Sequence, residues 1–311
     1  MKKFVMSLAL GASVLGLAGA AQAGDAASCQ TVRFADVGWT DIQVTTGVAS
    51  VLLEALGYKA DVKTLSVPVT YASLKNKDID VFLGYWKPSM NADIKPYLED
   101  KSVEELATNL DGAGYGIVVP QYVADAGIKS IADLAASKDK FDGKFYGIEA
   151  GNDGNRIIQT IIDDAKNNLK GWSVVESSEA GMLTEAEKAM KKNEWILFLG
   201  WAPHPVMGAM KLHYLDGVVD YGFGPATVAT VVRQGYTGEC PNVGKFIGNL
   251  KFDLAMEGAM MDPILNKSAD PKAVAADWLK ANADRVTPWL AGVTTFDGGD
   301  AAAAVAKALG K

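Results

Sequence analysis

The chain has 311 residues, of which 49% are hydrophobic and 22% are charged, and its formal net charge at pH 7 is −7. This length is enough for about two domains, each with its own buried core. The acidic balance disfavours nucleic acids and anionic membrane surfaces as partners, because both repel a negatively charged protein.

The first 23 residues have the three parts of a secretory signal peptide. A basic start, "MKK", precedes a short apolar segment over residues 4–20, and Ala21-Gln22-Ala23 fits the cleavage pattern of small residues. We predict cleavage after Ala23, which removes Lys2 and Lys3 and so changes the net charge from −7 to −9. The apolar segment is too short and too rich in Gly and Ala for a membrane span. The residue directly after the cleavage site is Gly24 and not Cys, so we expect an exported, soluble protein without a lipid anchor.

Strand and helix patterns alternate after the signal peptide, which indicates βαβ units and a mainly parallel sheet. The first block has predicted strands at 31–39, 59–67 and 79–84, and predicted helices at 41–56 and 70–77. Gly57 stands where the C-terminal cap of the first helix belongs. The second block has predicted strands at 115–120, 144–150, 172–177 and 194–201, and predicted helices at 130–136, 155–168 and 179–193. A further strand at 226–234 is followed by helices from about residue 241 to the end.

The chain has only two cysteines, Cys29 and Cys240, and an exported protein meets an oxidising compartment, so we expect a disulfide between them. Such a bond returns the C-terminal helices to the first block. The sequence therefore predicts an α/β protein with two lobes, one formed by 24–111 together with 212–311 and the other by 112–211. Two crossings, near 111–114 and 211–217, would join them.

The C-terminal ends of the strands in both lobes would then face a shared cleft, where ligands bind in open α/β folds. Four aromatic residues lie at this edge: Trp39, Trp86, Tyr115 and Trp201. Aromatic faces attract cations that cannot be hydrogen-bonded, above all quaternary ammonium groups, with about 0.5–2 kcal/mol per face. The other four tryptophans stand in or beside apolar runs and are expected to pack in the core: Trp172, Trp195, Trp278 and Trp289.

Polar residues beside the cleft have structural alternatives. Asp41 either caps the first helix, where the helix dipole favours a carboxylate, or faces the ligand. In the loop "EAGNDGNR", Asn152 or Asp153 could reach the cleft, although turn and cap roles are common for such residues. This loop lacks the Lys-Ser/Thr of a phosphate-binding loop, so we expect no nucleotide site.

Enzyme signatures are missing from the sequence. It contains no G-x-S-x-G and no H-E-x-x-H, and its two histidines, His204 and His213, have no metal-ligand spacing. His204 stands in "APHP", where shaping the loop is its expected role. We therefore expect no catalytic residue, no metal and no cofactor.

Five motifs together resemble the choline-binding proteins of bacterial ABC importers, within the glycine betaine/proline betaine binding family: "DVGWTD", "IDVFLGYWKPSM", "GAGYGIVVP", "GNDGN" and "ILFLGWAPHP". The resemblance covers essentially the whole mature chain. It implies a two-lobed periplasmic binding protein fold of type II with a two-stranded hinge, and it also implies a disulfide. By position in these motifs, it implies an aromatic box for trimethylammonium made of Trp39, Trp86, Tyr115 and Trp201. Asp41 and Asn152 resemble the pair that receives the choline hydroxyl.

The resemblance further implies a periplasmic monomer that delivers choline to an ABC permease and its ATPase. These must be separate chains, because this sequence contains neither a Walker motif nor a membrane span. Three alternatives remain: a glycine betaine or proline betaine receptor of the same fold, an exported choline-ester hydrolase, and a scavenging or sensing protein without a transporter.

Overall fold

The computed structural model describes residues 24–311, and the signal peptide predicted for residues 1–23 lies outside the described residues. Every helix between residues 24 and 311 is too short or too polar to span a lipid bilayer.

All nine strands of this part of the chain belong to one sheet, in the order β2-β1-β3-β9-β4-β7-β5-β6, with β8 paired to β4 beside this path. The strands are β1 Thr31–Asp36, β2 Lys59–Thr64, β3 Val81–Lys87, β4 Val103–Pro120, β5 Lys144–Tyr146, β6 Ser173–Val175, β7 Phe198–Ala202, β8 Leu212–Tyr214 and β9 Gly224–Arg233.

The α-helices are α1 Thr40–Ala55, α2 Val67–Lys75, α3 Asn91–Glu99, α4 Gln121–Asp125, α5 Asp153–Asp163, α6 Glu179–Lys191, α7 Pro205–Ala209, α8 Tyr236–Glu239, α9 Pro241–Asn249, α10 Leu254–Lys267, α11 Pro271–Ala281 and α12 Ala301–Ala308. Short 3₁₀ helices cover Ala27–Cys29, Ile131–Asp133, Ala135–Phe141, Ala165–Asn167, Val219–Tyr221 and Ala283–Leu290.

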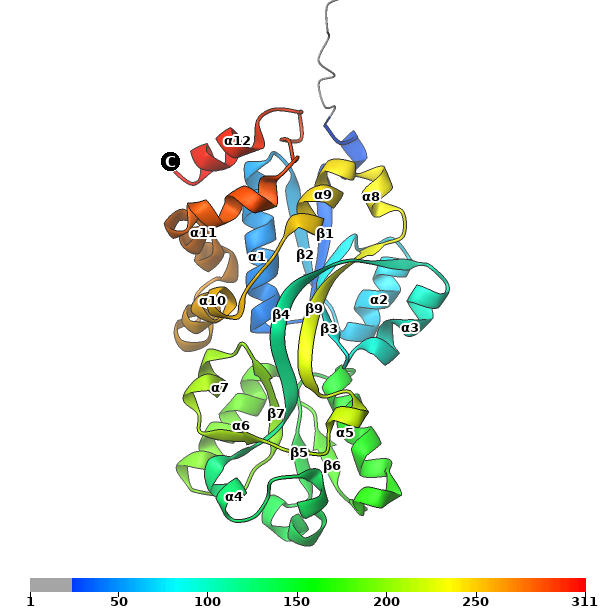
Figure 1. The fold of residues 1–311 in the computed structure, drawn as a ribbon, viewed down its shortest axis with the longest axis vertical. Helices are drawn as coiled ribbons and strands as arrows, with labels where there is room; N and C mark the ends of the chain where they lie inside the picture. Colours follow the sequence, from blue (N-terminus) through cyan, green and yellow to red (C-terminus); the bar gives the residue numbers. More distant parts are fainter. Residues whose placement is uncertain (1–23) are drawn as a thin grey trace, which may run out of the picture.

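The sheet is divided between two lobes (Figure 1). In the first lobe β1 pairs in parallel with β2 and β3, and helices α1–α3 and α8–α12 surround these strands. In the second lobe β5 pairs in parallel with β6 and β7, and helices α4–α7 surround them. The expected parallel pairing is therefore confirmed inside each lobe, and the expected two-lobed α/β fold is the observed one.

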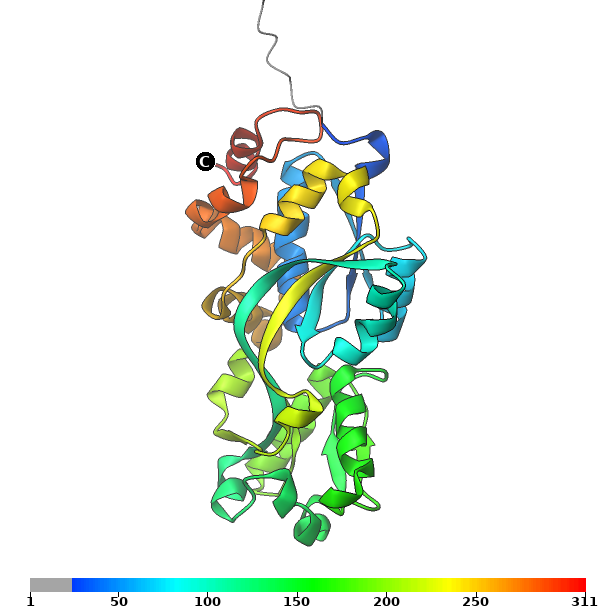
Figure 2. The same cartoon turned by 45° about the vertical axis from the view of Figure 1, so that its right-hand side comes forward.

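Two long antiparallel strands, β4 and β9, run from one lobe to the other (Figure 2). Their ladder extends from the pair Val103↔Arg233 in the first lobe to the pair Tyr115↔Gly224 beside the second. The stretch 211–217, where the sequence suggests the second crossing, contains β8, which pairs with the second-lobe end of β4 at Val118–Pro120. The strand that pairs with β4 between the lobes is β9.

Helix α1 ends as its sequence predicts. Gly57 has a φ of +91°, which a residue with a side chain rarely adopts, and its N–H donates to Glu54 O at 3.1 Å. The N–H of Tyr58 then donates to Leu53 O at 2.9 Å, so the final carbonyl groups of the helix have partners. This end lies far from the cleft, whereas the first turn of α1 lies beside it.

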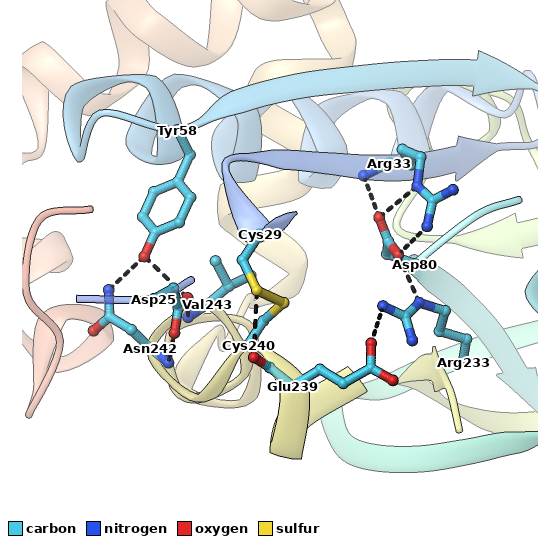
Figure 3. The surroundings of a disulfide bond; sticks show 10 residues. All are labelled: Asp25, Cys29, Arg33, Tyr58, Asp80, Arg233, Glu239, Cys240, Asn242 and Val243. Carbon is cyan, nitrogen blue, oxygen red and sulfur yellow. Dashed lines mark hydrogen bonds and ion pairs between the residues drawn. A yellow bond between two sulfur atoms is a disulfide. The ribbon is translucent and has the colours of Figure 1, made fainter. Parts of the chain in front are cut away.

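The start of the described chain is fastened to the first lobe at two points (Figure 3). Cys29 and Cys240 form the expected disulfide, which joins residues separated by 211 positions. The Asp25 carboxylate accepts hydrogen bonds from the N–H groups of Asn242 at 2.8 Å and Val243 at 2.9 Å. These groups begin α9, whose own N-cap residue, Cys240, makes no side-chain capping bond. Asp25 therefore caps α9 from the opposite end of the sequence.

A buried carboxylate joins the base of the hinge to the first lobe (Figure 3). Asp80 accepts hydrogen bonds from Arg33 Nε at 2.8 Å, from another Arg33 guanidinium nitrogen at 2.6 Å and from Arg233 Nε at 2.7 Å. Burial acts against the charged form, but these bonds lower the pKa of Asp80. The cluster holds β1, the start of β3 and the end of β9 together, so the first-lobe end of the hinge is fixed.

Candidate functional site

The four predicted aromatic residues line one pocket between the lobes, together with Ile148 and Asp153. Trp39 follows β1 and Trp86 lies near the end of β3, both in the first lobe. Tyr115 lies in β4 at the hinge and Trp201 lies in β7 of the second lobe. The pocket contains about 250 Å³ of space not filled by protein atoms, part of which is open to solvent. Each aromatic side chain is buried, and none is more than 7% exposed.

Tyr115 stands between two of the tryptophans. Its ring centroid lies 5.9 Å from that of Trp86 and 6.3 Å from that of Trp201, with interplanar angles of 57° and 85°. The rings therefore meet in tilted or edge-to-face contacts and do not stack on one another. The other four tryptophans pack as expected: Trp172 and Trp289 are buried, and Trp195 and Trp278 are partly buried against the core.

The similar sequences "FLGYWKP" and "FLGWAP" each place near the end of a strand a tryptophan whose backbone has the same kind of partner. In each, the backbone N–H of the tryptophan donates to a methionine sulfur, from Trp86 to Met90 at 3.3 Å and from Trp201 to Met207 at 3.2 Å. The preceding glycine is needed for close packing, since a Cβ on Gly200 would lie 2.7 Å from a Val118 methyl group. Each lobe thus carries one indole to the pocket near the end of a strand.

Asp41 lies beside the pocket but is not among the residues that line it. Trp39 is the N-cap residue of α1, so the interpretation of Asp41 as that cap is wrong, although Asp41 does lie in the first turn, where the dipole favours a carboxylate. Its Oδ2 accepts a hydrogen bond from Trp86 Nε1 at 3.2 Å. Its Oδ1 has no hydrogen-bond partner in the described part of the chain. Burial, and then the negative charge of Glu179, raise the pKa of the Asp41 carboxyl to about 7.

Asn152 caps α5, as the structural alternative proposed. Its Oδ1 accepts hydrogen bonds from the N–H groups of Gly154 at 2.8 Å and Asn155 at 3.2 Å, and also from the Tyr115 hydroxyl at 3.2 Å. The next residue, Asp153, lines the pocket instead. It is completely buried, and within residues 24–311 its Oδ2 has no hydrogen-bond partner. Burial raises the pKa of the Asp153 carboxyl to about 7.

The two basic residues closest to these motifs are engaged elsewhere. Lys87 forms an ion pair with Glu105 at 2.5 Å, and Arg156 binds Asp93 at 2.7 Å and the Ser89 carbonyl at 2.8 Å. Neither lines the pocket. Aromatic faces beside carboxylates, without a facing basic group among the lining residues, form a site that attracts a cation.

Three acidic or basic residues near the pocket were not singled out as functional from the sequence. Glu149 and Glu179 of the second lobe bind the residues that precede Asp41 in the first lobe. His204 accepts a hydrogen bond at Nδ1 from Met207 N–H, 3.3 Å away, and so caps α7, which is the loop-shaping role expected for it. Glu149 is the first residue of the loop "EAGNDGNR", so the sequence indicated that it lies near the cleft. Nothing in the sequence distinguishes Glu179 from other acidic residues at the start of a helix.

Comparison with known proteins gives a family and several relatives. The family model described as the substrate-binding domain of the ABC-type glycine betaine transport system matches residues 30–281. A solved structure described as an ABC-transporter choline-binding protein in complex with choline is 57% identical, with a TM-score of 0.88, and the match covers 91% of this chain and 99% of that one. An unliganded, semi-closed structure of an ABC-transporter choline-binding protein is also 57% identical over 91% of this chain and 100% of that one, with a TM-score of 0.83.

A curated relative is more distant. The glycine betaine/carnitine transport binding protein GbuC of Listeria monocytogenes serotype 1/2a (strain 10403S) is 30% identical over 173 residues. This match covers 54% of the present chain and 57% of the relative.

Proposed function

Because this chain belongs to the family of substrate-binding domains of ABC-type glycine betaine transport systems, we propose that it binds choline between its lobes and delivers it to a membrane permease. The family consists of binding proteins and not of enzymes, so the alternative of a choline-ester hydrolase is set aside. The permease and its ATPase are separate chains in this proposal, and the receptor works as a periplasmic monomer after removal of residues 1–23.

The observation that carries the proposal is the combination of four aromatic walls with two carboxylates that lack part of their hydrogen bonding. Asp41 Oδ1 and Asp153 Oδ2 are buried without a partner in the described residues. A buried acceptor without a donor is costly, so these atoms favour a guest that is positively charged and donates a hydrogen bond. Choline combines a trimethylammonium group, which suits the aromatic faces, with a hydroxyl donor.

In this arrangement Asp41 is the acceptor for the choline hydroxyl, and Asp153 supports the cation from the second lobe. Asn152 acts less directly than the resemblance implies, because its carbonyl oxygen already serves α5 and Tyr115. We propose that it orients Tyr115, since its side-chain NH2 group is also engaged, with Asp153 Oδ1 at 3.2 Å and Glu149 Oε1 at 3.4 Å.

Choline should bind at least tenfold more tightly than glycine betaine, a margin of about 1.4 kcal/mol. The two ligands share the trimethylammonium head, but betaine places a carboxylate where choline has a hydroxyl. The Asp41 carboxylate would repel it, and Lys87 and Arg156 are already paired with acidic residues. Titration calorimetry with choline, acetylcholine, betaine and proline betaine tests this directly. Betaine binding as tight as choline binding would overturn the assignment in favour of the betaine receptor.

The variant Asp41→Asn should weaken choline binding and narrow its margin over betaine. The amide is a weaker acceptor than a carboxylate, and its neutrality also removes the repulsion of betaine. The same calorimetry on the variant measures both effects. A margin that stays unchanged in the variant would show that Asp41 does not set the preference.

Choline affinity should rise between pH 6 and pH 8. Without ligand, the pKa of Asp41 and the pKa of Asp153 are about 7, so both carboxyls are mostly neutral at pH 6 and ionised at pH 8. A bound cation favours the ionised form, and binding therefore releases protons. Each group should make binding at pH 6 about tenfold weaker than at pH 8.

Calorimetry in buffers of different ionisation enthalpy counts the released protons. Choline itself carries a constant charge, so the titration belongs to the protein. The charged groups that act on Asp41 include Glu179 of α6 and Glu257 of α10, while Asp93 and Arg156 act on Asp153. At pH 6, Asp153→Asn should remove about one released proton. An affinity independent of pH would contradict the prediction.

We propose that the lobes divide near residue 111 in β4, as expected from the sequence. For the second boundary, the pairing of β8 with Val118–Pro120 supports a shift from residue 212 to the start of β9 at Gly224. Residues 112–223 would then move as one body against the rest when the cleft opens.

A further inference from the structure

Helix α1 begins at the pocket without a cap from its own segment. The N-cap residue, Trp39, makes no side-chain capping bond. Instead, Thr40 donates its N–H to Glu179 Oε2 at 2.9 Å and its hydroxyl to Glu179 Oε1 at 2.8 Å. Glu179 begins α6 in the second lobe, 139 residues away, and is buried. The first N–H of α1 is therefore satisfied from across the cleft.

A second carboxylate of the second lobe holds the neighbouring residue. Trp39 Nε1 lies 3.0 Å from Glu149 Oε1 and 3.1 Å from Oε2, and the two residues are 110 positions apart. Together, Glu149 and Glu179 fasten residues 39–41 of the first lobe. This segment carries one wall of the pocket and the Asp41 carboxylate.

Glu179 also contacts the support of a wall in its own lobe. Its Oε1 lies 3.0 Å from His204 Nε2. Because His204 Nδ1 accepts from Met207 N–H, we assign the ring proton to Nε2, which then donates to Glu179. The His204 ring meets Trp201 edge to face at 4.9 Å. One carboxylate thus links the segment of Trp39 in the first lobe to the turn of Trp201 in the second.

We propose that Glu179 is a positioning residue, which sets choline affinity by holding the lobes closed and aligning residues 39–41, without touching the ligand. The inference rests on the proposed function. Glu179 does not line the pocket, and its bonds to Thr40 join α6 of the second lobe to α1 of the first, so separation of the lobes would break them. The apparent dissociation constant equals the intrinsic constant divided by the closed fraction, so losing these bonds weakens binding even with an intact pocket.

The variant Glu179→Gln tests this, because it keeps the size of the side chain but loses the charge and one acceptor for Thr40. At pH 8, where Asp41 is mostly ionised with or without the charge of Glu179, choline binding should weaken about tenfold. The loss should arise mainly through faster dissociation, as expected for loss of hydrogen bonds to a charged acceptor. Thr40→Val, which keeps the N–H and removes the hydroxyl, should weaken binding by a smaller factor. Thr40→Ser should restore it. The control is Glu185→Gln on the same helix, whose exposed carboxylate pairs with Lys188 and should not affect binding.

A double-mutant cycle separates the contact between Thr40 and Glu179 from a general structural role of either residue. If Thr40 and Glu179 act through one contact, the double variant should bind choline about as well as Glu179→Gln alone. Full additivity, or unchanged affinity in Glu179→Gln, would overturn the proposal. Circular dichroism checks folding of each variant, and Thr40→Val keeps the test valid if Glu179→Gln does not fold.

Small-angle X-ray scattering without ligand provides a readout that is independent of choline. The closed fraction should be lower in Glu179→Gln than in the unmutated protein. An equal closed fraction would contradict the proposal that Glu179 holds the lobes closed. If the unmutated protein does not bind choline at all, the proposed function fails, and this scattering comparison still decides whether Glu179 favours closure.

Discussion

Replacement of Trp86 by Ala should weaken choline binding about thirtyfold or more. The variant loses one aromatic face, worth up to about 2 kcal/mol in a desolvated site. It also loses the indole N–H that donates a hydrogen bond to Asp41 Oδ2. The Asp41 carboxylate would then have no side-chain hydrogen bond from β3. Trp201→Ala should act in the same direction through the opposite wall. Calorimetry with choline measures both losses.

Two controls separate the pocket from the core. Trp86→Phe keeps an aromatic face but cannot donate to Asp41, so its binding should fall between the unmutated protein and Trp86→Ala. Trp278→Ala removes a partly buried tryptophan that packs against the core in α11, and it should lower the melting temperature while leaving choline affinity nearly unchanged. Unfolding of Trp86→Ala would instead show that this residue serves the core.

Loss of the Cys29–Cys240 bridge should reduce the free energy of unfolding by about 5 kcal/mol. The bond spans 211 positions, and the entropy cost of closing such a loop is large in the chain-entropy model. Choline affinity should change little, because Cys29 precedes β1 whereas Trp39 follows its other end. Denaturant unfolding of the double Ser variant measures the loss.

Thiol titration of the unreduced, denatured protein provides the chemical check. It should find no free sulfhydryl group, and two titratable thiols would contradict the bridge. Unchanged stability in the double Ser variant would show that other contacts already confine the start of the chain, such as those of Asp25 with α9.

Much of the fold could be predicted because its elements are marked by local patterns. The short apolar runs of β1 and β3, the apolar face of α1 and the glycine after it depend only on neighbouring residues. The extent of β4 could not be predicted in the same way. Its first part, 103–114, includes the polar sequence "EELATNLDG" and is a strand because β9 pairs with it, which is a contact over more than a hundred residues.

The candidate site divides in the same manner. Trp39 follows β1, and Trp86 and Trp201 lie near the ends of β3 and β7, so the order of the predicted strands was enough to bring these residues and Tyr115 of β4 together. Asp153, and not Asn152, lines the pocket because of the first turn of α5. Asn152 is the N-cap residue, so its side chain must turn back toward the helix backbone. Glu179 is defined only by Thr40, its partner across the cleft, and no local pattern marks such a pair.

The capping of α9 by Asp25 gives the maturation step a structural meaning. Cleavage after Ala23 would leave Asp25 as the second residue of the processed chain, just inside its new end. A cut two residues further on would remove this carboxylate and leave the buried N–H groups of Asn242 and Val243 without an acceptor, at a cost of about 1–3 kcal/mol for each group. Accurate processing and a stable C-terminal region would then be linked, so that a wrongly trimmed receptor is also a weakened one.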